Sequence, residues 1–276
     1  MPELPEVETV RKTLKNKIIN EKILDVKVNY PNIIEYPNVL EFIKLLKNQT
    51  IKDIKRRGKW LIFELDNYCL LSHLRMEGKF NLKNFNDEVN KHEHIIFKFK
   101  DSELRYQDTR KFGRMHLLKK DELLKRKPLN ELGLEPFDKN LTSSYLKEKY
   151  LNKTLAIKTV LLDQSIITGI GNIYADEILF LSKINPLKKA KDLNELELNE
   201  IIKNTKTILN QAINDGGTTI RSYTSSEGIH GKFQQHLLVH TKENEPCINC
   251  QNKIVRIKVN QRSTYYCPNC QKWFVK

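Results

Sequence analysis

The spacing of apolar positions changes twice along the chain, and each change predicts a different kind of structure. The first apolar positions that recur every three or four residues are Val7, Val10, Leu14 and Ile18. This spacing predicts an amphipathic helix over residues 3–18. Pro2 stands at the opening of that helix, and Glu3 and Glu6 lie in its first turn, where the helix dipole favours acidic side chains.

Short segments of alternating polarity, divided by Asn, Asp, Gly and Lys turns, follow between about residues 23 and 118. These segments are ILDVKVNY, WLIFEL, CLLSHL, HIIFKFK, LRYQD and RMHLL. A helical stretch over residues 38–47 interrupts them, but no long helix stands between one segment and the next. This pattern favours an antiparallel sandwich or barrel over a sheet built from βαβ units.

Helical spacing returns over residues 142–212, whereas residues 215–233 show neither period and are rich in Gly, Ser and Thr. The second stretch therefore predicts a turn followed by a long loop. We expect an α+β multidomain chain whose domains cover residues 1–134, 135–236 and 237–276.

Four of the five cysteines lie in the last thirty residues, in two Cys-x2-Cys pairs separated by sixteen residues. They are Cys247, Cys250, Cys267 and Cys270, whereas Cys69 stands alone. Four thiolates at this spacing close a tetrahedral zinc site, and such a filled site is structural because it leaves no position for substrate. The sequence predicts one structural Zn²⁺ per monomer, holding a hairpin that is too small to fold alone.

The chain is strongly basic, with 48 Lys and Arg against 34 acidic residues and a formal net charge of +14. Such a charge is typical of proteins that bind nucleic acid. Lys, Asn and Ile are abundant together, as an AT-rich coding sequence would also cause, so the charge does not decide the partner alone. We find no signal peptide and no apolar run near the roughly 18 residues of a membrane span, and expect a cytoplasmic protein.

Gly169 and Gly171 precede a predicted helix that begins near Asn172, in the sequence GIGNIYADE. The free amides at a helix start beside small glycines form a seat for a phosphate, and the Asn side chain adds a donor. Glycine before Asn is also ordinary helix capping. These residues alone leave both interpretations open.

The first residues offer a nucleophile as well as a helix start. Removal of Met1, which a small second residue favours, would leave the secondary amine of Pro2 at the mouth of the first helix. That amine can attack a sugar aldehyde carbon, and its adduct must remain a cationic iminium because proline has no second N–H to lose. Glu3 could supply or accept the proton. A plain helix start explains the same residues.

Together these motifs resemble the bacterial formamidopyrimidine-DNA glycosylases almost from end to end. The matching segments are PELPEVET (2–9), RRGKW (56–60), SHLRMEGKF (72–80), DTRKFG (108–113), TGIGNIYADE (168–177), GGTT (216–219) and NQRSTYYC (260–267). The resemblance implies an N-terminal helix plus an antiparallel β-sandwich, then a helix-two-turn-helix domain with a C-terminal β-hairpin zinc finger.

The resemblance also implies a bifunctional DNA glycosylase and AP lyase of base excision repair. Pro2 would be the nucleophile, Glu3 its acid/base partner, Glu6 a supporting carboxylate and Lys59 a catalytic contact near the nucleophile. The substrate would be double-stranded DNA that contains oxidised purines, chiefly 8-oxoguanine opposite cytosine and formamidopyrimidines, with strand cleavage by β,δ-elimination. The enzyme would act as a monomer in the cytoplasm, associated with the nucleoid.

Further roles follow from the same resemblance. Residues that would bind DNA are His73, Arg110, Lys158, Asn172 and Arg262. Those that would fill the space left by an extruded nucleotide are Met76, Arg110 and Phe112, two apolar wedges and a donor for the widowed base. Lesion recognition would involve Glu77, Ile173, Arg221 and Tyr223, the last two in a loop over residues 221–233.

Two positions depart from the family pattern. Thr109 follows Asp108 where the family frequently has Pro, and Arg221 stands where some relatives have Lys. The second departure leaves the lesion preference open. Two alternatives remain. One is an endonuclease VIII-like glycosylase for oxidised pyrimidines, and the other is a non-catalytic zinc-ribbon protein that binds nucleic acid through its charge.

Overall fold

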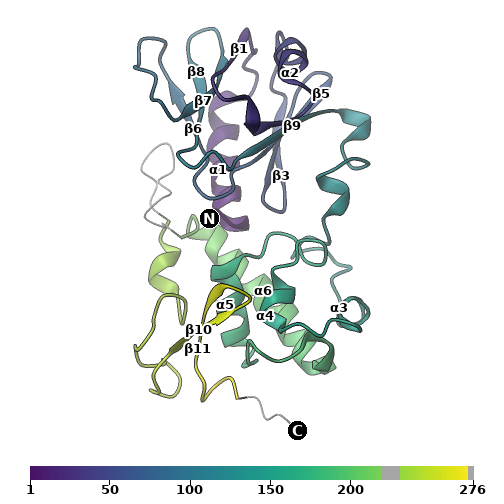
Figure 1. Cartoon of the computed structure of the whole chain (residues 1–276), viewed down its shortest axis with the longest axis vertical. Helices are drawn as coiled ribbons and strands as arrows, with labels where there is room; N and C mark the ends of the chain where they lie inside the picture. The colour runs from purple at the N-terminus through teal and green to yellow at the C-terminus, as the bar shows by residue number, and fades with distance from the viewer. Residues whose placement is uncertain (219–230, 273–276) are drawn as a thin grey trace. The chain divides into compact units, whose positions relative to one another are not determined.

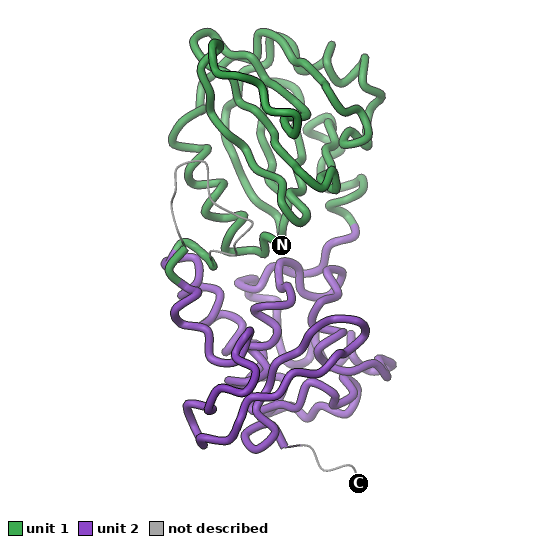
Figure 2. The backbone as a smooth tube through the Cα atoms, turned by 60° about the vertical axis from the view of Figure 1, so that its left-hand side comes forward, with its two compact units in different colours: residues 1–130, 216–232 green, residues 131–215, 233–276 purple. Residues whose placement is uncertain are grey.

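The structure, a computed structural model, describes residues 1–218 and 231–272 (Figure 1). The chain divides into two compact units, which Figure 2 colours separately. The first comprises residues 1–130 and 216–232, and the second comprises residues 131–215 and 233–276.

The first unit contains two β-sheets whose buried faces share one core. One sheet has the order β1 (Asp25–Val28), β7 (Glu93–Lys98), β8 (Glu103–Gln107) and β6 (Lys79–Lys83). The other has the order β2 (Ile34–Tyr36), β9 (Arg114–Lys119), β5 (Tyr68–His73), β4 (Trp60–Glu64) and β3 (Asp53–Arg57). The predicted antiparallel sandwich is confirmed, except that β2 runs parallel to β9.

Two α-helices complete this unit, α1 (Leu4–Ile18) and α2 (Val39–Leu46). The apolar positions of α1 at Val7, Val10, Leu14 and Ile18 all enter the core, as the three- and four-residue spacing predicts. Short 3-10 turns lie at η1 (Pro31–Ile33), η2 (Lys120–Glu122) and, where the two units join along the chain, η3 (Leu129–Glu131).

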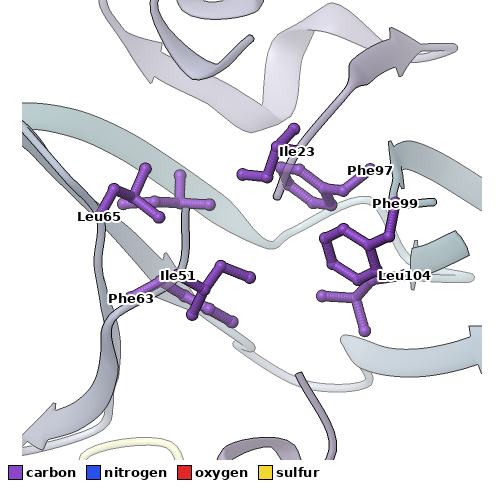
Figure 3. Close-up of a pocket in the computed structure, with 8 residues that line it drawn as sticks. Ile23, Ile51, Phe63, Leu65, Phe97, Phe99 and Leu104 are labelled. Atoms are coloured by element: carbon purple, nitrogen blue, oxygen red, sulfur yellow. The ribbon is translucent and has the colours of Figure 1, made fainter. Parts of the chain in front are cut away.

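One small pocket inside the first unit is lined by apolar side chains alone. Figure 3 shows this pocket, whose side chains carry only carbon, with Phe63 from β4 and Leu104 from β8 among them. The other lining residues are Ile23, Ile51, Leu65, Leu70, Phe97 and Phe99. With no polar group to orient a ligand, this pocket belongs to the packing of the core and is not a binding site.

Three strands escape the sequence prediction, β2, β3 and β6, and each lies at an edge of its sheet. β3 buries only Ile54 and β6 buries only Phe80, because basic and polar side chains fill most other positions. Charged edge strands are common because they discourage pairing with other chains. The apolar alternation on which the prediction depended is therefore weakest here.

The first helix begins at Leu4, one residue later than the predicted start at residue 3. Glu3 is the N-cap, with extended backbone angles of φ −101° and ψ −170°. Its own N–H is taken by the Glu6 carboxylate at 2.8 Å, as in a capping box. Pro2 and Glu3 therefore precede the helix and are held by its first turn.

The second unit is helical, with a two-stranded hairpin near its end. Its α-helices are α3 (Ser143–Tyr150), α4 (Ile157–Leu161), α5 (Asn172–Leu181) and α6 (Glu195–Asn214), with 3-10 turns η4 (Ala190–Asp192) and η5 (Phe233–His236). The hairpin pairs β10 (Val255–Val259) with β11 (Arg262–Tyr266). The helical region and the helix start at Asn172 are confirmed. The finer division into three domains stays a prediction, and none of the described helices is long and apolar enough to cross a bilayer.

One side chain of β8 carries a buried charge. Arg105 is completely buried and binds the carboxylates of Glu93 and Glu103 at 3.1 and 2.8 Å. Its guanidinium also donates to the carbonyls of Asp87 (2.8 Å) and Glu88 (3.0 Å) in the segment between β6 and β7. The Arg105 side chain thus holds the segment between β6 and β7 against β8.

Replacement of Arg105 by Leu should lower the free energy of unfolding by about 3–5 kcal/mol, because two carboxylates would stay buried without their cation. Urea denaturation followed by circular dichroism measures this loss. The matched control is Lys47→Leu, which removes an exposed ion pair to Asp25 and should cost less than about 1 kcal/mol. Equal effects of the two substitutions would contradict the assignment.

Candidate active site

The amino terminus of the chain lies among charged side chains of the first unit. Burial lowers the pKa of the Met1 amino group from its ordinary value, and Lys59 lowers it further, while Glu3, Glu6 and Glu77 act to raise it. These four side chains are therefore within electrostatic reach of the first backbone nitrogen. The structure brings together the residues to which the sequence assigns the chemistry, and both Pro2 and Glu3 are buried.

Two segments that are far apart in the sequence donate hydrogen bonds to the Glu6 carboxylate. Its Oε2 accepts the backbone N–H of Glu3 at 2.8 Å. Its Oε1 accepts both the N–H and the hydroxyl of Thr218, at 2.8 and 3.0 Å. The carboxylate thus joins the start of α1 to the GGTT turn, a link that no sequence pattern announced.

Lys59 occupies the two-residue turn between β3 and β4. Arg57 and Trp60 pair across this turn, and the positive φ of 56° falls on Gly58, which adopts it without strain. Lys59 is 6% exposed. A tight turn of this kind aims the lysine with little freedom.

Arg56 ties the same turn to the first helix. Its guanidinium donates to the Gly58 carbonyl at 2.9 Å and to Glu8 of α1 at 3.2 Å. Burial acts to raise the pKa of Glu8, but Arg11 and Arg56 lower it overall. The ion pairs therefore stay formed at neutral pH and hold the turn that carries Lys59 beside α1.

Two loops of this unit carry the residues expected to fill a vacated base stack. Phe112 is 45% exposed and Arg110 lies over its ring, with 4.8 Å between the guanidinium carbon and the ring centroid. Met76, on the other loop, is half-buried, as is its neighbour Glu77. The space-filling roles and the lesion contact stay predictions, with side chains available at the surface.

Asp108 organises the loop of Phe112 from below. It is fully buried, and its carboxylate accepts the N–H groups of Arg110 at 3.1 Å and Gly113 at 2.8 Å. A side-chain carbon on Gly78 or on Gly113 would collide with the Tyr106 hydroxyl. Both loops therefore converge on one tyrosine ring, and the glycine in each is needed for that close approach.

His73 ends β5 and is an uncharged group. Burial lowers its pKa to about 3, with smaller contributions from Arg75 and Lys59. Its Nδ1 accepts the N–H of Arg75 at 3.0 Å, and its ring meets Trp60 edge-on at 4.8 Å. At neutral pH this histidine could offer DNA a neutral hydrogen bond but no positive charge.

In the second unit, the start of α5 is joined to the hairpin. The Asn172 side chain donates to the Ser263 carbonyl at 3.0 Å. Arg262, the residue before Ser263 on β11, is exposed and lines a surface hollow. Ile173, expected near the lesion, is 6% exposed. Asn172 thus bonds the residue directly after Arg262, which brings the two predicted phosphate-binding residues into one region.

Lys158 was expected to bind DNA, but the structure places it inside the second unit. It is completely buried, and its ammonium pairs with Asp176 of α5 and reaches the Asn172 carbonyl at 3.4 Å. The other oxygen of Asp176 contacts His240 Nδ1 at 2.7 Å. An ammonium that is buried and paired in this way has no surface to offer a phosphate, so we assign Lys158 to the support of α5.

Glu177 forms a second buried link from α5. Its carboxylate accepts three consecutive N–H groups, from Leu238 (2.8 Å), Val239 (3.0 Å) and His240 (2.8 Å). Burial raises the pKa of Glu177, and these three donors act against that rise. The segment leading into the zinc module is thereby held on the helix that carries Asn172.

The four cysteines Cys247, Cys250, Cys267 and Cys270 form one cluster, with their sulfur atoms within 4.8 Å of one another. None is in a disulfide. Four free thiols that converge from two turns fit the tetrahedral donor set of zinc, with each ligand supplied as a thiolate. Cys69 is buried in β5 of the first unit and does not belong to this cluster.

Arg221 and Tyr223, expected to recognise the lesion, and most of the predicted loop over residues 221–233 lie outside the described residues. Their roles stay predictions.

Comparison with known proteins identifies the family. Three family models match the chain in order: formamidopyrimidine-DNA glycosylase N-terminal domain at residues 1–115, formamidopyrimidine-DNA glycosylase H2TH domain at 132–224, and zinc finger found in FPG and IleRS at 244–272. The chain belongs to the formamidopyrimidine-DNA glycosylase family.

Individual relatives agree with this assignment. The chain is 48% identical to the formamidopyrimidine-DNA glycosylase of Bacillus cereus, over 98% of this chain and 99% of that one. It is similar to Lactococcus lactis Fpg in complex with DNA that contains an abasic site, with a TM-score of 0.93, 40% identity, and coverage of 99% of this chain and 100% of that one. A structure of the same enzyme with DNA that contains an oxidized pyrimidine matches with a TM-score of 0.92 and 40% identity, at the same coverage.

As a formamidopyrimidine-DNA glycosylase, the protein is a DNA repair glycosylase of base excision repair with the AP lyase activity general to this family. The matching zinc finger model and the four-cysteine cluster establish one structural zinc site. The expected fold class and zinc site are thereby confirmed.

Sequence reasoning missed the residues that support the predicted ones: Tyr106, Asp108, Asp176, Glu177, Thr218 and His240. Only Asp108 has a local signal, because an Asp two residues before a basic turn residue is typical of a side chain that bonds its own loop. The hydroxyl of Tyr106 bonds the nearby Asp108, but its close contact with Gly78 joins segments far apart in sequence. The remaining residues bond partners too distant in sequence for any spacing rule to find.

Substitution of Cys267 by Ser should abolish zinc binding, because three thiolates no longer fill the tetrahedral site. A colorimetric chelator assay should find one zinc ion per wild-type chain and much less in the variant, together with weaker DNA binding. Cys69→Ala is the control and should keep one zinc ion. Full zinc content in Cys267→Ser would show that the ligand set is wrong.

Substitution of Asp108 by Asn should destabilise the loop of Phe112. The amide nitrogen of Asn cannot accept the Gly113 N–H, and leaving a buried donor unsatisfied costs about 1–3 kcal/mol. Thermal unfolding measures the effect. The control is Thr109→Ala, which changes the exposed residue next to Asp108. Its melting temperature should stay within about a degree of the wild-type value. An Asp108→Asn protein as stable as the wild type would refute this support role.

Proposed function

We propose that the enzyme excises oxidised purines, 8-oxoguanine opposite cytosine and formamidopyrimidines, from double-stranded DNA and then cuts the strand by β,δ-elimination through the amine of Pro2. The observation that carries the proposal is the largely buried amino terminus, which lies within electrostatic reach of Glu3, Glu6, Lys59 and Glu77. Burial there favours the neutral, nucleophilic form of an amine. The names of the relatives support the substrate class.

Base removal would begin once Met1 is cleaved off. The Pro2 nitrogen attacks the sugar C1′ as the bond from C1′ to the base breaks, and the base leaves with a proton. Protonation of the ring oxygen opens the sugar and leaves a cationic iminium between Pro2 and C1′. Glu3, buried beside this nitrogen, is the carboxyl placed to move the proton.

Strand cleavage would follow from the same iminium. Its positive charge acidifies the protons on C2′, and removal of one expels the 3′ phosphate. A second elimination expels the 5′ phosphate, and hydrolysis then frees Pro2. Lys59, held in its tight turn, supplies a positive charge beside the departing or flanking phosphate.

The grip on DNA would come from both units. The formal charge of +14 falls to about +12 when four thiolates bind one zinc ion, and it still favours a polyanion. Asn172 and Arg262 would bind phosphates, while Phe112, Met76 and Arg110 would occupy the vacated stack. The neutral ring of His73 would add a polar contact. We also propose that the enzyme acts as a monomer in the cytoplasm, near the nucleoid.

Oxidised pyrimidines are a second candidate substrate class. One observation favours them: Lactococcus lactis Fpg has been crystallised with DNA that contains an oxidized pyrimidine. The residues that would discriminate between the two classes include Arg221 and Tyr223. The non-catalytic zinc-ribbon alternative is set aside, because family membership makes the chain a glycosylase.

Borohydride trapping tests both the chemistry and the substrate. A duplex with 8-oxoguanine opposite cytosine should give a reduced adduct on Pro2, located by mass spectrometry, more rapidly than a duplex with dihydrouracil. Faster trapping on dihydrouracil would move the enzyme to the oxidised pyrimidines. Absence of any adduct, from protein that has lost Met1 and binds the duplex, would rule out the Pro2 mechanism.

Two variants separate chemistry from binding. Pro2→Gly and Glu3→Gln should each lower strand cleavage of the 8-oxoguanine duplex by at least about a thousandfold. The first replaces the secondary amine, whose adduct must stay a cationic iminium, by a primary amine, and the second removes the carboxyl that transfers the proton. The dissociation constant for the duplex should change by less than about tenfold, because the phosphate grip lies elsewhere. Cleavage at the wild-type rate by either variant would contradict the mechanism.

A further inference from the structure

Thr218 lies in a short stem of the first unit whose two sides almost touch. Its backbone forms an antiparallel bridge with Lys232, and it is 2% exposed. Gly217 has a φ of +79°, and a side-chain carbon on Gly231 would collide with the Gly217 carbonyl. This stem has little freedom to move.

The stem is fastened to Glu6 through a single oxygen. The N–H and hydroxyl of Thr218 both donate to Oε1, at 2.8 and 3.0 Å. A side-chain carbon on Gly217 would come within 2.7 Å of that same oxygen. Because a threonine side chain has few rotamers, both donors keep one geometry. The carboxylate of Glu6 is thus set by the stem as much as by its own helix.

Glu6 passes this constraint on to the nucleophile. Its other oxygen holds the N–H of Glu3 at 2.8 Å, and that N–H belongs to the peptide bond between Pro2 and Glu3. Since a peptide bond is planar and rigid, holding its N–H fixes the orientation of the Pro2 carbonyl end. A line of hydrogen bonds therefore runs from the Thr218 hydroxyl through Glu6 to the residue that carries the reactive amine.

We propose that Thr218 is a positioning residue for the Pro2 nucleophile and acts through Glu6. The inference rests on the proposed role of Pro2. Without the hydroxyl, Oε1 loses one of its two donors from Thr218, and the carboxylate gains freedom to rotate away from the Glu3 N–H. The amine would then meet the sugar C1′ in a wider spread of orientations, which slows attack without weakening DNA binding.

Thr218→Val keeps the shape of the side chain and removes the hydroxyl, whereas Thr218→Ser keeps the hydroxyl. In single-turnover experiments, Thr218→Val should react about tenfold more slowly on both the 8-oxoguanine duplex and an abasic duplex, because both begin with attack by Pro2. Thr218→Ser should stay within about twofold of the wild type. The dissociation constants of all three proteins should agree within about twofold.

The amplitude of borohydride trapping separates positioning from folding. A positioning role lowers the rate constant and leaves the trapped fraction unchanged, whereas a purely structural role lowers the trapped fraction and leaves the rate constant of the active molecules unchanged. The second result would overturn the proposal. So would a Thr218→Ser protein as slow as Thr218→Val.

A double-substitution cycle tests the route through Glu6. If Thr218 acts through this carboxylate, Glu6→Gln combined with Thr218→Val should be no slower than Glu6→Gln alone. If the rate reductions of the two single substitutions multiply in the double variant, Thr218 acts by another route and the proposal is overturned. A wild-type enzyme that forms no Pro2 adduct would instead defeat the proposed function, and with it this inference.

Discussion

The end of a polypeptide normally frays, because it has few contacts to offset the entropy of its free backbone. Here the residues at that end must hold still, since the amine that would react sits at the second residue. Glu6 meets this constraint by binding the Glu3 N–H in the first turn of α1, and the turn is in turn anchored by four apolar side chains in the sandwich core. The chemistry of the chain terminus thus depends on the packing of the helix behind it.

The second unit follows the same logic with different groups. The half-buried Asn172 begins a helix, α5, that is held by two buried carboxylates. Asp176 pairs with Lys158, and Glu177 accepts backbone N–H groups from the segment before the hairpin that carries Arg262. Zinc holds the hairpin internally, and the carboxylate of Glu177 holds the segment that leads into it. A buried acceptor that loses even one donor is left unsatisfied, which costs free energy. These carboxylates therefore favour a single arrangement of helix and hairpin.

Patterns within one element made much of this structure predictable. The spacing of Val7, Val10, Leu14 and Ile18 predicted α1, and the paired Cys-x2-Cys motifs predicted the zinc site, because each depends on neighbours in sequence. The edge strands β3 and β6 were missed because basic side chains hide their alternation. Lys158 shows a different limit. The sequence suggests a lysine that is free to bind DNA, and only the fold reveals that it is buried and paired with Asp176. Bonds such as Thr218 to Glu6, which span 212 positions, leave no trace in local sequence.

The stem formed by Gly217 and Gly231 separates the start of α1 from the residues that connect its two sides. Gly217 and Gly231, on the two sides of the stem, lie in direct contact, so the distance between them is the same whatever residues join them. Substitutions, insertions or deletions in that connection therefore need not disturb Glu6 or the start of α1. The hydrogen bonds that hold the start of α1 can therefore be kept while that connection changes in length or composition.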